Sequence, residues 1–128
     1  MSGDESSVST EDIRYLAHER ARPGQLEMIH DCLAALQVGG HHLAAAPTGI
    51  GKTAAALAAA IDAARTANGP RTIFFLTSRQ SQHKIVVDTV RRINGRRPPQ
   101  EKVRLVDMVG QSNMCVQPFA KESPALFS

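Results

Sequence analysis

Residues His42–Thr53, HLAAAPTGIGKT, decide the fold that the sequence predicts. The stretch begins as a short apolar run, passes through a turn containing Gly49 and Gly51, and continues into an alanine-rich segment. Glycine adopts backbone angles that are closed to other residues, so a polyphosphate can approach the main-chain N–H groups of such a turn. A helix that starts near Lys52 adds the positive end of its dipole. The stretch therefore predicts a strand, a phosphate-binding loop and a helix.

Two side chains next to this turn predict a site for ATP and Mg²⁺. Lys52 is placed to reach the β- and γ-phosphates, and the Thr53 hydroxyl is placed to hold the magnesium ion, so both are candidate catalytic residues. Ala46 replaces the first glycine of the general pattern G-x-x-x-x-G-K-S/T. The loop residues predicted to bind the nucleotide are Pro47, Thr48, Gly49, Ile50, Gly51, Lys52 and Thr53.

The chain around the loop predicts an α/β fold. Apolar residues recur at three- and four-residue steps within 25–36, and the segments 52–66 and 81–93 also have helical patterns. Apolar runs lead into the loop from residue 41 and recur at 71–77 and 103–109, which predicts strands. The order strand, helix, strand indicates a parallel sheet of about three strands with flanking helices.

The composition of the chain bears on the cellular compartment in which we expect the protein. The chain has 128 residues, a formal net charge of +3 and two cysteines, Cys32 and Cys115. It has no secretory signal pattern and no apolar run long enough to cross a membrane, so we expect an intracellular protein with reduced thiols, cytoplasmic, or nuclear in a eukaryote. Residues 1–12 are polar and predict a disordered leader, which leaves residues 13–128 as the domain. Cys32 lies on the apolar face of its helix and is expected to be a small core residue.

Polar and basic segments follow the predicted strands. Thr77–His83 carries hydroxyl, amide and guanidinium groups that suit phosphate oxygens, although a polar turn that caps a helix has the same composition. The most basic stretch of the chain could contact a nucleic-acid backbone or form a solvated surface, and it contains Arg91, Arg92, Arg96, Arg97, Lys102 and Arg104. Asp107 ends the third apolar run, but Arg104 interrupts that run and no second acid follows, which argues against a magnesium-polarising acid.

Four stretches resemble a known family. They are Arg22–Gln25, the loop Ala46–Thr53, the polar segment Leu76–His83 and the pair Met114–Cys115 together with Val109–Gly110. Together they resemble the N-terminal part of a superfamily 2 DNA helicase of the XPD and DinG type, which carries an iron–sulfur cluster in its first motor domain. The resemblance implies a partial P-loop (RecA-like) motor domain.

The resemblance also implies roles for individual residues. Gln25 would recognise the adenine, Thr77, Ser78 and Arg79 would contact single-stranded or forked DNA, and Cys115 would be the first of four ligands of a 4Fe–4S cluster. The implied activity is ATP-dependent 5′-to-3′ translocation by a monomeric motor in DNA repair.

Several parts of the family pattern do not occur in the 128 residues. The D-E-A-H acid pair, three cluster cysteines and the second motor domain are missing, so the chain is expected to stop in or before the iron–sulfur region and to be inactive alone.

Three alternatives remain open from the residues alone. One is a nucleotide-binding regulator or adaptor that does not hydrolyse ATP and uses the basic stretch as a partner surface. Another is a P-loop phosphotransferase that acts on a small molecule. The third is a partial product that does not fold stably, because an open three-stranded parallel sheet has an unpaired edge.

Overall fold

The computed structural model describes residues 13–47, 51–108 and 110, and within them the chain forms three α-helices and one short 3₁₀ turn. These elements are α1 (Gln25–Gln37), α2 (Lys52–Thr66), α3 (Gln80–Gly95) and η2 (Pro99–Glu101). The three predicted helices are confirmed, and α2 begins and ends at the predicted residues. The predicted leader, residues 1–12, lies outside the described residues.

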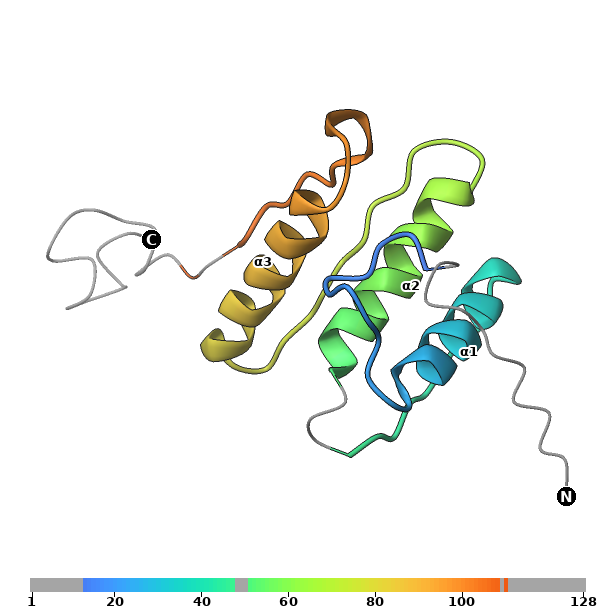
Figure 1. The fold of residues 1–128 in the computed structure, drawn as a ribbon. Helices are drawn as coiled ribbons and strands as arrows, with labels where there is room; N and C mark the ends of the chain where they lie inside the picture. The colour runs from blue at the N-terminus through green and yellow to red at the C-terminus, as the bar shows by residue number, and fades with distance from the viewer. Residues whose placement is uncertain (1–12, 48–50, 109, 111–128) are drawn as a thin grey trace, which may run out of the picture.

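Helix α2 lies between α1 and α3 and packs against both (Figure 1). Ala55, Ala58 and Ala59 are buried in a cluster with Ile29 of α1. On the neighbouring side of α2, Ala54, Leu57 and Ile61 are buried with residues of α3, namely Val86, Val90 and Ile93. Small side chains toward α1 and larger ones toward α3 explain how one short helix supplies both contacts, since alanine lets neighbouring backbones approach closely.

The segment before α1 joins the two clusters. Tyr15 and Ala17 are buried in the cluster between α2 and α3, whereas Leu16 is buried in the cluster between α1 and α2. This segment crosses α2 in Figure 1 before it reaches the start of α1. Successive side chains therefore point to opposite sides of the crossing, and residues 15–17 close the small core from a third direction.

The predicted α/β fold with a parallel sheet of about three strands is wrong for the described part of the chain. None of the segments expected to be strands, which begin at residues 41, 71 and 103, forms a strand there. They are extended in Figure 1 but irregular, and none of the backbone hydrogen bonds found between described residues joins one of them to another. A β-ladder requires a neighbouring strand about 4.8 Å away, with the N–H and C=O groups of the two strands in register.

Side-chain exposure explains why these apolar runs misled the prediction. Phe74 and Leu76 are 81% and 88% exposed, while Ile73 and Phe75 are 37% and 38% exposed. The run thus alternates between largely and partly exposed side chains and buries neither face. An apolar sequence favours burial, but strand formation also depends on cross-strand neighbours, and those are missing here.

Within the described ranges, no helix combines the length and the apolar character needed to cross a lipid bilayer.

The packing of α2 against α1 gives a first testable prediction. Ala59→Leu places three additional carbon atoms at a fully buried position of α2, so it should lower the free energy of unfolding by about 1–3 kcal/mol. Urea unfolding followed by circular dichroism measures the change. Ala34→Leu adds the same atoms at an exposed position of α1 and serves as the control. Equal midpoints for the two variants would contradict the close packing of α2.

Candidate functional site

The start of α2 carries the residues that the motif predicted to bind phosphate. Gly51 precedes the helix with φ 80° and ψ 51°, a left-handed conformation that glycine adopts without strain. Lys52 is the first helical residue and is exposed, and Thr53 follows it, half-buried. Pro47 is exposed on the other side of the turn, while Thr48, Gly49 and Ile50 lie outside the described residues.

The Lys52 ammonium lies back across this turn. Its Nζ donates a hydrogen bond to the carbonyl oxygen of Ala46, 3.0 Å away. The lysine therefore spans the turn from the helix start to the last part of the extended segment before it. An ammonium in this position is close to the positive end of the α2 dipole, so the site concentrates positive potential where an anion would bind.

Gln25 approaches the same turn from α1. Its side-chain Nε2 donates to the carbonyl oxygen of Gly51 at 3.1 Å, and its Oε1 accepts from the backbone N–H of Arg22 at 3.0 Å. The residue is buried, although it is polar. The structure thus places Gln25 against Gly51 of the predicted phosphate loop, through a contact with the protein backbone. The adenine contact that the resemblance implied stays a prediction.

The predicted DNA-contacting residues lie at the start of α3. Ser78 and Arg79 are exposed, and Arg79 is the residue immediately before the helix. The Thr77 hydroxyl oxygen is buried without a hydrogen-bond partner among the described residues. The starts of α2 and α3 lie at the same end of the molecule (Figure 1), so the structure places the two predicted sites on one side.

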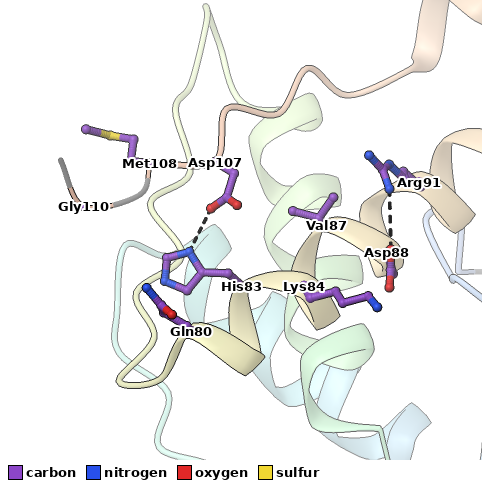
Figure 2. Close-up of a pocket in the computed structure, with 9 residues that line it drawn as sticks. All are labelled: Gln80, His83, Lys84, Val87, Asp88, Arg91, Asp107, Met108 and Gly110. Atoms are coloured by element: carbon purple, nitrogen blue, oxygen red, sulfur yellow. Dashed lines mark hydrogen bonds and ion pairs between the residues drawn. The ribbon is translucent and has the colours of Figure 1, made fainter. Parts of the chain in front are cut away.

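A groove that the sequence did not predict lies between α3 and residues Asp107, Met108 and Gly110 (Figure 2). It has a volume of about 450 Å³ and is open to solvent. His83 Nδ1 and Asp107 Oδ1 are 2.8 Å apart and join its two sides. Further along α3, Asp88 pairs with Arg91 at 3.6 Å. Asp107 therefore contacts a histidine of α3, and no local sequence signal could have shown this pairing across 24 residues.

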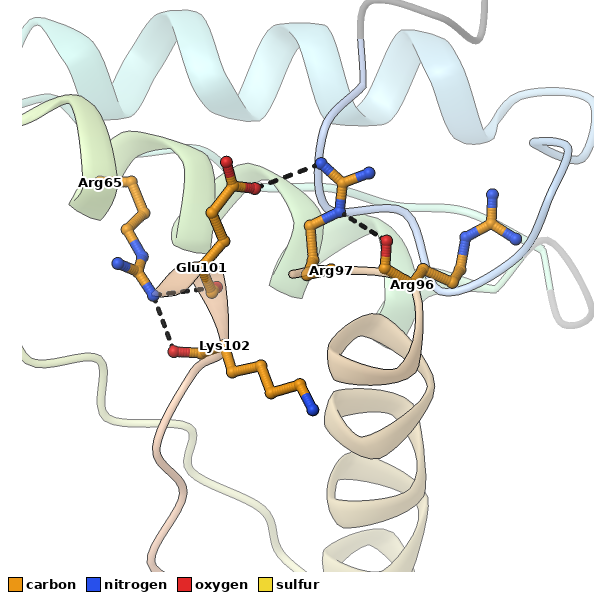
Figure 3. A network of polar contacts seen from close by, with 5 residues as sticks. All are labelled: Arg65, Arg96, Arg97, Glu101 and Lys102. Atoms are coloured by element: carbon orange, nitrogen blue, oxygen red, sulfur yellow. Dashed lines mark hydrogen bonds and ion pairs between the residues drawn. The ribbon is translucent and has the colours of Figure 1, made fainter. Parts of the chain in front are cut away.

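The basic stretch is partly used for internal contacts (Figure 3). Arg97 pairs with Glu101 at 3.4 Å, and its guanidinium carbon lies 6.0 Å from the centre of the Tyr15 ring. Arg65 of α2 donates to the carbonyl oxygens of Glu101 and Lys102 at 2.9 and 2.8 Å. The other members of the stretch, Arg91, Arg92, Arg96, Lys102 and Arg104, are exposed. A network of contacts therefore holds the segment, while most of its charge faces solvent.

The described residues do not supply a metal-cluster site. No group of three or more His, Cys, Asp or Glu side chains that could hold a metal ion occurs in the described ranges, and Cys115 lies outside them. Cys32 is half-buried on α1 against the α1–α2 cluster, as expected from its helical face. Burial raises the pKa of the Cys32 thiol, which favours the neutral thiol over the metal-binding thiolate.

Comparison with known proteins identifies the family of the region that contains this site. Residues 22–117 match the family described as DEAD/DEAH box helicase, and this match covers more than half of the chain. No curated protein and no solved structure matches the chain. The matched range includes the Gln25 contact, the phosphate-loop turn and the start of α3.

The network around η2 gives a second testable prediction. Arg65→Ala removes both hydrogen bonds to the carbonyl oxygens of Glu101 and Lys102, so this segment should open more often. The loss of these contacts should lower the local stability of the segment by about 1 kcal/mol. We therefore expect trypsin to cleave after Lys102 roughly fivefold faster, because the open form is populated about five times more. Mass spectrometry of timed digests measures the rate. Arg71→Ala, at an exposed position, is the control, and equal rates in the two variants would show that Arg65 does not hold the segment.

Proposed function

Because the chain belongs to the DEAD/DEAH box helicase family, we propose that its loop 47–53 binds the triphosphate of Mg–ATP for a helicase motor. Full-length members of this family are ATP-dependent nucleic-acid helicases. The observation that carries the proposal is the turn at Gly51 and Lys52, where a left-handed glycine, a helix start and a lysine ammonium converge. The family match does not favour the adaptor or the small-molecule phosphotransferase.

Lys52 is the residue with the clearest proposed role. Its ammonium donates to the Ala46 carbonyl oxygen, and a phosphate oxygen is a stronger acceptor because it carries charge. If a phosphate oxygen replaced the Ala46 carbonyl oxygen as the acceptor, Lys52 would keep its hydrogen bond and gain electrostatic attraction. The Thr53 hydroxyl, one residue further along α2, would complete the site by holding Mg²⁺, which prefers oxygen ligands and retains several waters.

The finer proposal is a 5′-to-3′ DNA helicase of the XPD and DinG type, active in DNA repair. Its support is the sequence of the loop, where Ala46 stands at the first glycine of the general motif, and the segment at 76–83. In this proposal Thr77, Ser78 and Arg79 contact the backbone of single-stranded DNA. The exposure of Ser78 and Arg79 next to the start of α3 is consistent with that role.

The proposal assigns this chain nucleotide binding rather than the whole reaction. Hydrolysis in such motors requires acids that order magnesium and water, and the 128 residues contain no D-E-A-H pair. A 4Fe–4S cluster would need four thiolates, whereas the sequence has two cysteines and the described one, Cys32, is half-buried against the α1–α2 cluster. No step of the proposed function therefore depends on a cluster.

Removal of the Lys52 ammonium tests the nucleotide site. Lys52→Ala should weaken binding of Mg–ATP at least tenfold, because the phosphates lose a charge-assisted hydrogen bond worth about 1.5–3 kcal/mol. Isothermal titration calorimetry with a nonhydrolysable ATP analogue measures the affinity. Lys84→Ala removes an exposed lysine from α3 and should leave the affinity unchanged. Identical affinities for Lys52→Ala and the unaltered chain would remove the proposed phosphate contact.

Salt dependence tests the proposed DNA contact. Arg79→Ala should weaken binding of a fluorescein-labelled single strand and lower the slope of log K against log salt by about 0.7, the value for one lost phosphate contact. Fluorescence anisotropy between 50 and about 200 mM salt gives both quantities. Arg71→Ala is the matched control at another exposed position. An unchanged slope for Arg79→Ala would place the DNA contact elsewhere.

A further inference from the structure

Four exposed basic side chains lie at the end of α3 and in the segment after η2, and we call them the α3-end surface: Arg92, Arg96, Lys102 and Arg104. None of their charged groups has an acidic partner within the described residues. The two acids nearby are already paired, Asp88 with Arg91 and Glu101 with Arg97. In Figure 3 the side chains of Arg96 and Lys102 point away from the Glu101 carboxylate. The positive charge of this surface is therefore not neutralised by the described part of the fold.

Hydrogen bonds to the backbone hold the segment after η2 against the end of α3. Asn94 Nδ2 donates to the Val103 carbonyl oxygen at 2.9 Å, and the Val103 N–H donates to Asn94 Oδ1 at 2.8 Å. One carboxamide thus binds both backbone groups of Val103, as a neighbouring strand would. Arg65 adds two bonds to the carbonyl oxygens of Glu101 and Lys102. Residues 101–103 are therefore fixed on two helices at once.

These contacts also determine how the four charges are presented. Val103 packs against the buried cluster between α2 and α3, so its neighbours Lys102 and Arg104 point away from that cluster, and both are exposed. Arg92 and Arg96 are four residues apart, which places them on one side of the helix with a rise of about 6 Å. The backbone that carries the charges is thus in place before a ligand arrives, which lowers the cost of ordering on binding.

Helix stability explains only part of this arrangement. A basic residue in the last turn of a helix interacts favourably with the helix dipole, and Arg92 lies in the last turn of α3. Lys102 and Arg104 lie outside the helix and gain nothing from its dipole. Their position beside the same helix end therefore calls for another reason.

We propose that the α3-end surface binds the phosphate backbone of double-stranded nucleic acid. Three of its four side chains are arginines, whose planar guanidinium groups bind phosphate through two parallel hydrogen bonds. A strand of a duplex carries one phosphate per 3.4 Å of helix axis, so a rise of about 6 Å between two arginines spans about two phosphates.

The make-up of the surface favours a duplex over the other polyanions. Proteins that bind single strands stack the bases on aromatic rings, whereas the ring in this network, Tyr15, is 3% exposed and has Arg97 over it. An acidic protein partner usually adds buried apolar or aromatic anchors at the centre of its contact, but all four members of this surface are charged. A phosphate backbone needs neither bases nor anchors, because the release of counterions supplies the affinity.

This inference goes beyond the proposed function, since neither Lys52 nor Arg79 takes part in the contact. Arg79 precedes α3 and the α3-end surface lies at its other end, about 24 Å along the 16 residues of the helix. Binding of a duplex here therefore requires neither a nucleotide at the start of α2 nor a single strand at the start of α3.

The test uses the 128-residue chain and a fluorescein-labelled, blunt-ended DNA duplex. Replacing both arginines of α3, Arg92→Ala with Arg96→Ala, should weaken binding at low salt at least tenfold, or about one decade, and lower the slope of log K against log salt by about 1.8, or about 0.9 per lost phosphate contact. Fluorescence anisotropy measures both quantities. Arg20→Ala with Arg71→Ala removes the same net charge at two exposed positions elsewhere and should leave the slope unchanged.

The outcomes separate this inference from the proposed function. Equal losses in the two double variants would show that net charge alone attracts the duplex, which overturns the inference. Equally tight binding of polyglutamate at the same salt would also overturn it, in favour of an acidic protein partner. If Arg79→Ala loses single-strand binding while the Arg92 and Arg96 variant binds the duplex normally, the proposed function stands and this inference fails.

A measurement on the unaltered chain does not depend on how the variants fold. Lys102 should be protected by the duplex from acetylation, whereas the exposed Lys84, in the first part of α3, should react at the same rate with and without DNA. Mass spectrometry of timed reactions gives both rates. Unchanged acetylation of Lys102 at a saturating duplex concentration would overturn the inference.

Discussion

The burial of α2 against two neighbours at once is the constraint on which the rest of the structure depends. Its alanines at 55, 58 and 59 meet α1, while Leu57 and Ile61 meet α3. A helix held on one side could rotate or slide, but contacts on two sides fix both its rotation and its position along the axis. The first turn of α2 therefore has a defined place, and Gly51, Lys52 and Thr53 take their positions from packing that lies well inside the core.

Packing alone does not hold the residues on either side of the predicted loop, and two polar contacts add to it. Gln25 binds the Gly51 carbonyl from the α1 side, and Lys52 binds the Ala46 carbonyl from the α2 side. The first contact is partly buried and the second is exposed. A buried hydrogen bond is costly to break because the freed groups find no water, whereas an exposed one exchanges readily. This difference suits a site in which the backbone stays in place while the lysine moves to an anion.

The sequence predicted those features that depend on neighbours within a few residues. Helical periodicity predicted a helix at 81–93, whose buried face carries Val86, Val90 and Ile93, and the loop motif identified Lys52 beside Gly51. Strands depend on distant partners, so the apolar run at 71–77 was misread, and Phe74 and Leu76 are exposed. The contacts Gln25–Gly51 and His83–Asp107 join residues 26 and 24 positions apart, and nothing local in the sequence marks them.

The basic residues also lie differently in the structure from what their grouping in the sequence suggests. The basic stretch looked like one surface in sequence, yet Arg97 is paired with Glu101 and stacked on Tyr15, and Arg65 ties the stretch to α2. The exposed Arg96 and Lys102 follow the end of α3, whereas Arg79 precedes its start, and the 16 residues of α3 span about 24 Å. A phosphate backbone bound beside the start of α2 would thus meet Arg79 before Arg96 or Lys102. Net charge alone does not show this separation between the two ends of α3.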